Sequence, residues 1–173
     1  GDFKEYEWKF SNISAIPHDN NQPEYKQHLP RLIFSTKNIE EAYSFFTEQF
    51  SSVVPDNIDN KLNRILEGKS SKLDTILAIQ DMVVNHINHF KIQPQYLGFR
   101  TKDNKHVIEN NGGTTIEKTN LLSSLLEKLG FEAEIVGIIP SDFYEEKIGN
   151  LKLLEQYYVK VQPEDEIIYL SAI

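Results

Sequence analysis

The chain has 173 residues, of which 39% are hydrophobic, 25% charged and 11% aromatic. This composition is ordinary for a globular protein, and the length suits one domain or slightly more. The absence of cysteine excludes disulfides, thiolate catalysis and cysteine-based zinc sites. The formal net charge is -8, and lysine and arginine are scattered singly, so we expect no nucleic-acid partner.

No apolar run approaches the ~20 residues that span a bilayer, so we expect no membrane span in this chain. No signal peptide is visible at the start. The aromatic pattern of Phe3, Tyr6, Trp8 and Phe10 is already under way at the first residues. We therefore expect this chain to be a piece of a longer protein.

The first third of the chain reads as strand, loop and strand. Aromatic and β-branched residues over 3–16 predict a strand, proline and amide side chains over 17–28 a loop, and the apolar run 29–35 a second strand. Helices should follow, each with a polar cap before it and a proline or glycine near its end. We expect them at residues 39 to about 54, 57–67 and 71 to about 90.

We expect the second half of the chain to contain, in this order, one long loop, one helix and three strands. Residues 91–113 have no periodicity, and long loops in compact domains tend to be functional. Glycine turns bracket a helix from Thr114 or Thr115 to Leu129, with leucines on its core face. Strands are predicted at 132–139, 156–161 and 166–172, the last two as a hairpin. This order predicts an α+β fold with helices packed on a small antiparallel sheet.

The segment from Gly112 to Val136 has the arrangement that places a nucleophile at a helix N-terminus, where the helix dipole lowers a thiol pKa. It resembles the transglutaminase-like fold, a branch of the papain-like thiol enzymes. Family members read Gly-Asp-Cys-Lys-Asp-Lys-Ala and continue through two Leu-Leu pairs to a glycine and a strand. Here Gly113-Thr114-Thr115 begins the motif, and the leucine pairs, Gly130, Ala133 and Val136 keep its register.

The resemblance implies that the family's Cys-His-Asp triad has been lost. The cysteine position is Thr115, the histidine position at the start of the next strand is Gln156, and the aspartate position is Ser171. We regard these three as vestigial triad positions and expect no catalytic residues. Every histidine precedes Thr115, so none can occupy the later strand; they are His18, His28, His86, His89 and His106.

The resemblance also divides the chain. Residues 1–36 resemble the end of the β-rich domain that precedes this fold in a group of bacterial extracytoplasmic proteins, and residues 37–173 resemble the transglutaminase-like domain. We therefore expect a periplasmic or secreted, multidomain protein in which this domain is a pseudoenzyme. It would act as a binding or scaffold module without a cofactor. A peptide, a protein segment or a glycan would occupy the former active-site groove.

Three alternatives compete with these interpretations. Thr115 is a nucleophile only if a base lies beside it, and capping the helix is the simpler role, which Thr114 can fill equally. His86 and His89 stand three residues apart on the long predicted helix, so with His106 or acidic residues they permit a hydrolase with a metal or carboxylate site. The third alternative is a purely structural spacer between neighbouring domains.

Overall fold

The computed structural model describes residues 5–12, 34–164 and 166–173, and the chain divides into two units, 1–33 and 34–173. Residues 5–12 are exposed and belong to no helix or strand, although the rings of Tyr6 and Trp8 stack with centroids 5.7 Å apart. The strand predicted over 3–16 is therefore wrong for residues 5–12, because alternation alone forms no strand without ladder hydrogen bonds. The rest of that prediction, the loop 17–28 and most of the strand 29–35 lie outside the described residues.

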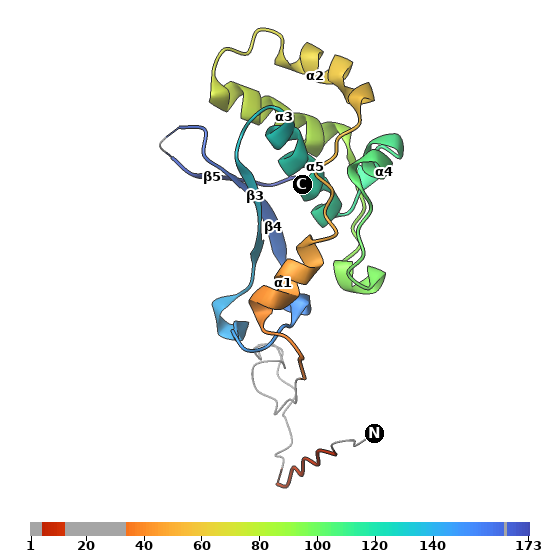
Figure 1. Ribbon diagram of the computed structural model, residues 1–173, viewed down its shortest axis with the longest axis vertical. Coiled ribbons are helices and arrows are strands. Elements are labelled where there is room, and N and C mark those ends of the chain that lie inside the picture. The colour runs from red at the N-terminus through yellow and green to blue at the C-terminus, as the bar shows by residue number, and fades with distance from the viewer. Residues whose placement is uncertain (1–4, 13–33, 165) are drawn as a thin grey trace, which may run out of the picture. The chain divides into compact units, whose positions relative to one another are not determined.

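Residues 34–173 form an α+β unit, as predicted (Figure 1). The helices are α1 (Ile39–Thr47), α2 (Asp59–Leu66), α3 (Lys72–His86), α4 (Asn104–Glu109) and α5 (Thr115–Lys128). Single 3-10 turns are η2 (Asp56–Ile58), η3 (Pro94–Leu97), η4 (Ser141–Phe143) and η5 (Leu151–Leu153). The strands are β1 (Asn88–His89), β2 (Gly112–Gly113), β3 (Ala133–Ile138), β4 (Gln156–Val161) and β5 (Ile168–Leu170).

Two separate ladders connect these strands. β3, β4 and β5 form an antiparallel sheet in that order, with Ala133 opposite Val161 and Val159 opposite Leu170. β1 and β2 pair in parallel over two residues, which sets His89 opposite Gly113. The three predicted strands of the second half are confirmed, and the short parallel pair was not predicted.

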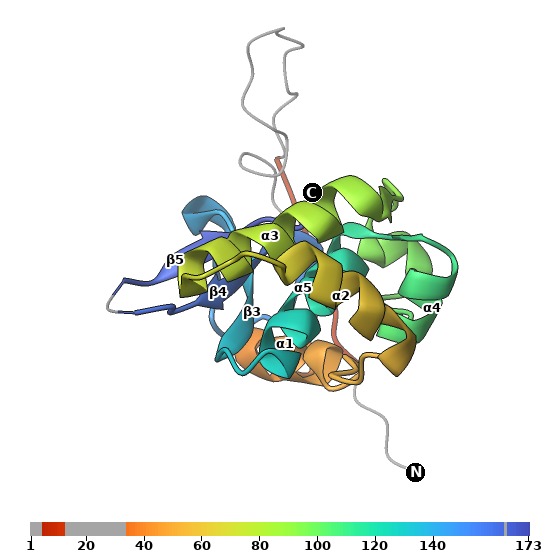
Figure 2. The ribbon, with the colours of Figure 1, turned by 90° about the horizontal axis from the view of Figure 1, so that it is seen from above.

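Helix α5 is the centre of this unit, packed against the sheet, α3 and α4 (Figures 1 and 2). Every residue from Ile116 to Leu126 is buried, including the polar ones. Its leucines join α2, α3 and the inner face of β4 in the main core; the four fully buried ones are Leu121, Leu122, Leu125 and Leu126. A smaller cluster of Phe46, Ile116 and Tyr157 lies toward α1.

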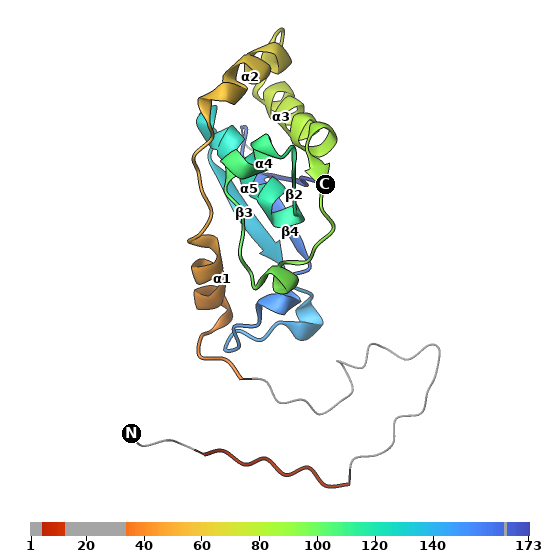
Figure 3. The ribbon, with the colours of Figure 1, turned by 90° about the vertical axis from the view of Figure 1, so that its right-hand side faces the viewer.

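Two helices end earlier than predicted. α1 stops at Thr47, and after a turn at residues 48–49 the segment 50–55 runs alongside α5 toward η2 and α2 (Figure 3). α3 stops at His86, because the chain turns into the β1–β2 pair and Lys118 of α5 binds the last carbonyls of the helix. The end of α3 is set by partners distant in the sequence, so local propensity could not place it.

Candidate functional site

Helix α5 begins at the expected place, with Thr114 rather than Thr115 as its N-cap. The Glu117 carboxylate accepts hydrogen bonds from the backbone N–H groups of Thr114 and Lys102, each at 2.8 Å. Thr114 and Glu117 thus form the reciprocal pair typical of a capping box. Of the two threonines that the sequence offered as the cap, Thr114 is therefore the one that caps the helix, and the Thr115 hydroxyl is available for another partner.

That partner is His89. The Nε2 atom of His89 lies 2.9 Å from Oγ1 of Thr115, and both side chains are half-buried. The pairing of His89 with Gly113 brings the imidazole to the start of α5, across 26 positions of sequence. Sequence reasoning placed His89 on a helix beside His86, which is wrong because α3 ends at His86. No local signal in the sequence indicates this contact.

Electrostatics keep this imidazole neutral. Burial lowers the pKa of His89 below its usual value of 6.5, and the positive charges of Lys118 and Lys91 lower it further. A neutral imidazole has one donor and one acceptor nitrogen, so Nε2 can either accept the Thr115 proton or donate to its oxygen. The contact is therefore a hydrogen bond between two uncharged groups near pH 7.

Lys118 stands one turn along α5 and is only 1% exposed. Its ammonium donates to the carbonyl oxygens of Ile87, at 2.8 Å, and Val84, at 3.3 Å. Burial lowers the pKa of this lysine. Two backbone carbonyls compensate only part of the cost of removing this charge from water. Through these two hydrogen bonds, Lys118 connects α5 to the end of α3.

Gln156 and Ser171 lie at one end of the sheet, on neighbouring chain segments. Continuing the β4–β5 register by one step places Ser171 opposite Tyr158, two residues from Gln156. Gln156 is exposed, and its Oε1 accepts from the Tyr158 hydroxyl at 2.6 Å. Ser171 Oγ donates to the Ile173 carbonyl at 2.9 Å. Among the described residues, Thr115 is the one of the three positions that contacts a histidine, and the vestigial-triad interpretation of all three stays a prediction.

The other candidate histidines are separate from this contact. His86 is exposed at the end of α3, and His106 Nδ1 lies 2.7 Å from Asp103 on the exposed face of α4. No group of three or more histidine or acidic side chains that could hold a metal ion occurs within residues 5–12, 34–164 and 166–173. Nor is any helix in this described part long and apolar enough to cross a membrane.

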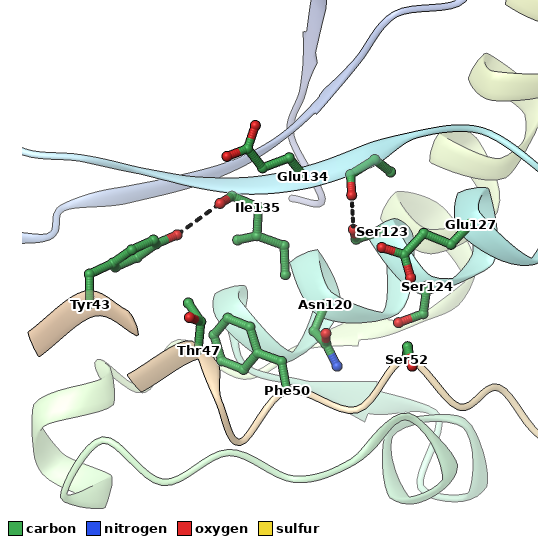
Figure 4. A pocket seen from close by; sticks show the side chains of 11 residues that line it. Tyr43, Thr47, Phe50, Ser52, Asn120, Ser123, Ser124, Glu127, Glu134 and Ile135 are labelled. Carbon is green, nitrogen blue, oxygen red and sulfur yellow. Dashed lines mark hydrogen bonds between the residues drawn. The ribbon is translucent and has the colours of Figure 1, made fainter. Parts of the chain in front are cut away.

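A pocket of about 330 Å³ opens on another side of α5 (Figure 4). α1 and the residues after it contribute Tyr43, Thr47, Phe50 and Ser52; α5 contributes Asn120, Ser123, Ser124 and Glu127; β3 contributes Ala133, Glu134 and Ile135. A hollow of about 530 Å³ adjoins it and shares Glu127, Ala133 and Glu134. The three triad positions line neither space. Sequence reasoning did not find this pocket.

Comparison with known protein families finds no matching family, and no curated protein matches the chain. One solved structure is similar: the crystal structure, at 2.00 Å resolution, of a putative protease from Parabacteroides distasonis. It superposes with a TM-score of 0.69 at 18% identity, and the match covers 79% of this chain and 27% of that one. Most of this chain therefore shares a fold with about a quarter of that protein.

Proposed function

We propose that this chain is a non-catalytic transglutaminase-like domain that acts as a binding or scaffold module in a larger bacterial extracytoplasmic protein. The observation that carries the proposal is the hydroxyl of Thr115 at the helix start where the family has its thiol. A threonine hydroxyl ionises far above neutral pH, and threonine nucleophiles usually rely on a free N-terminal amine, which an internal residue lacks.

The positions matched to the rest of the triad support the same proposal. A glutamine amide takes up no proton at neutral pH, so Gln156 cannot act as the general base. Its side chain is also engaged by Tyr158. Ser171 carries no charge with which to stabilise an imidazolium, and its hydroxyl bonds its own chain end.

The likeness to the Parabacteroides protein fits a fold retained after its chemistry was lost. That protein is described as a putative protease, and at 18% identity the likeness concerns the fold alone. A fold does not carry an activity unless the reacting residues are present, because function lies in the site.

One observation favours a second candidate, a hydrolase that uses Thr115 with His89 as its base. The 2.9 Å contact is within reach for proton transfer, and the neutral imidazole is the form a general base requires. A third group normally orients such a base, and no hydrogen bond to His89 Nδ1 is present among the residues described here. We therefore prefer the non-catalytic proposal.

The test measures the rate at which the whole chain hydrolyses a nitrophenyl ester and the peptides of a casein digest. The variants Thr115→Val, Thr115→Ser and His89→Gln are assayed in parallel. We expect all four proteins to match the uncatalysed rate. Turnover by the natural chain that is lost in Thr115→Val and in His89→Gln, and kept or raised in Thr115→Ser, would establish the second candidate and refute the first.

Restoring the thiol tests the assignment of the lost triad. Thr115→Cys alone places a thiol beside His89, so any activity it gains has to be measured again in Thr115→Cys with His89→Gln. We expect that double variant to be inactive until Gln156→His and Ser171→Asp are added. Thiol-dependent activity in the double variant without those additions would show that Gln156 and Ser171 are the wrong positions.

A further inference from the structure

The pocket beside α5 is built on a rigid polar wall. Asn120, Ser123, Ser124 and Glu127 follow the i, i+3, i+4, i+7 spacing and so share one face of the helix. Behind them, the carbonyl of Ser51 accepts from Asn104 Nδ2 at 2.7 Å and from Asn120 Nδ2 and Ser124 Oγ at 3.0 Å. This network fixes Asn120 and Ser124 before any ligand arrives, which lowers the entropic cost of binding, whereas Glu127 is exposed and lies outside the network.

Most of the hydrogen-bond donors in the wall are already used. Both protons of the Asn120 amide go to Ser51 and Asn104, and the Ser124 proton goes to Ser51. The hydroxyls of Tyr43, Thr47 and Ser123 donate to the backbone carbonyls of Ile135, Ser44 and Ala133. The exposed Ser52 at the rim is the one lining hydroxyl for which no such bond is found among the described residues.

What faces the pocket is therefore a set of acceptors. Asn120 is 5% exposed, and its Oδ1 accepts none of the hydrogen bonds found within the described residues. Figure 4 shows the Glu127 carboxylate directed over Ser123 and Ser124, while Glu134 lies on the opposite side of β3, where its carboxylate pairs with Lys160 at 3.0 Å. No lysine, arginine or histidine lines the pocket. Phe50 adds an aromatic ring.

From this arrangement we propose that the pocket binds the guanidinium group of an arginine side chain carried by a partner polypeptide. A guanidinium has five donors and no acceptor, pairs with a carboxylate through two hydrogen bonds, and stacks on aromatic rings. Glu127 is the anionic partner, Asn120 Oδ1 and the hydroxyl oxygens of Ser123 and Ser52 accept the remaining protons, and Phe50 contacts the guanidinium plane. Ser124 Oγ already accepts from Asn104 Nδ2 at 2.9 Å and stays part of the wall.

This proposal rests on the proposed function as a binding module, and it names a different site from the former active site. Glu127 stands twelve residues along α5 from Thr115, about 18 Å at 1.5 Å per residue. A partner held by its arginine therefore leaves the start of α5 free. The net charge of -8 also favours a basic segment.

The experiment is an amide NMR titration of the whole chain with acetyl-Gly-Arg-Gly-amide, the citrulline peptide of the same shape, and the lysine peptide. We expect saturable shifts at Asn120, Ser123 and Ser124 with the arginine peptide, none with citrulline, and weaker ones with lysine. Equal binding of the citrulline peptide would overturn the proposal, because citrulline keeps the shape and loses the charge.

Two glutamate variants locate the contact. Glu127→Gln should weaken binding of the arginine peptide by about tenfold or more, because it removes the charge from a charge-assisted pair. Glu155→Gln removes the same charge from an exposed position that does not line the pocket, and it should change the affinity by less than about twofold. Equal weakening in both variants would mean non-specific attraction and would refute the site. Hydrolytic activity in the assay above would refute the proposed function without affecting this titration.

Discussion

At the scale of single residues, the half-buried Tyr43 and the buried Tyr157 differ in their hydrogen bonds. The Tyr43 hydroxyl donates to the Ile135 carbonyl at 2.9 Å, whereas the buried Tyr157 hydroxyl has no partner among the described residues. Burial and the nearby Glu134 raise the pKa of Tyr43 to about 12, and burial, with Tyr43 beside it, raises the pKa of Tyr157 further. Both groups therefore stay protonated at neutral pH.

This difference predicts opposite effects of the same substitution. Tyr157→Phe should leave the free energy of unfolding unchanged or raise it by up to about 1 kcal/mol, because it removes a buried polar group without a partner. Tyr43→Phe should lower the free energy of unfolding by about 1 kcal/mol, because it leaves the Ile135 carbonyl without its donor. Urea unfolding followed by circular dichroism measures the free energy of unfolding of both variants. An equal decrease in the two would contradict the absence of a hydrogen-bond partner for the Tyr157 hydroxyl.

The lowered pKa of His89 predicts a pH effect. Below pH 6.5 the unfolded chain binds a proton at this residue before the folded protein does, so stability falls as the pH drops from 6.5 through the lowered pKa. NMR titration of the imidazole should give a midpoint below 6.5. Lys91→Gln should raise that midpoint because it removes one repelling charge. Lys105→Gln removes the same charge at an exposed position of α4 and should leave the midpoint unchanged. A midpoint at or above 6.5 in the natural chain would refute the assignment.

At the scale of elements, Gly149 joins the segment between β3 and β4 to the start of α1. Its N–H donates to the Lys37 carbonyl at 2.8 Å, and a Cβ atom at this position would lie 2.8 Å from the Ala42 Cβ and from the carbonyl oxygens of Lys37 and Asn38. Backbone atoms cannot move aside as a side chain can, so only glycine allows this approach.

Gly149→Ala should therefore lower the free energy of unfolding by about 1–3 kcal/mol, the usual cost of overpacking. Lys147→Ala, an exposed position two residues earlier, is the control and should change it by less than about 0.5 kcal/mol. Thermal unfolding of the two variants beside the natural chain gives the comparison. An unchanged midpoint in Gly149→Ala would show that the segment does not pack on α1 this closely.

At the scale of the whole molecule, both hydrophobic clusters found among the described residues lie within residues 34–173. A unit that contains its own core folds independently, so a chain cut to residues 34–173 should unfold in one cooperative transition. We expect its melting temperature to fall within about 3 °C of that of the full chain, measured by calorimetry. A broad, non-cooperative transition would show that the first 33 residues belong to the same folding unit, and so test the predicted division at residue 36.

The sequence by itself determined the elements whose signals are local. The polar caps predicted before the helices are present as Asn38 and Ser71, Gly130 follows α5, and the apolar pattern over residues 156–161 specified β4. Caps, glycine turns and apolar periodicity act within a few residues, so they can be read from the sequence. The absence of cysteine likewise excluded thiol chemistry without any structure. Only the tertiary structure decided where α3 ends, that His89 rather than a later residue meets Thr115, and that α5, α1 and β3 enclose a pocket of acceptors. Each of these three features depends on groups that are separated by tens of residues in the sequence. Packing around α5 brings these groups together, and no local preference of the chain indicates that it will.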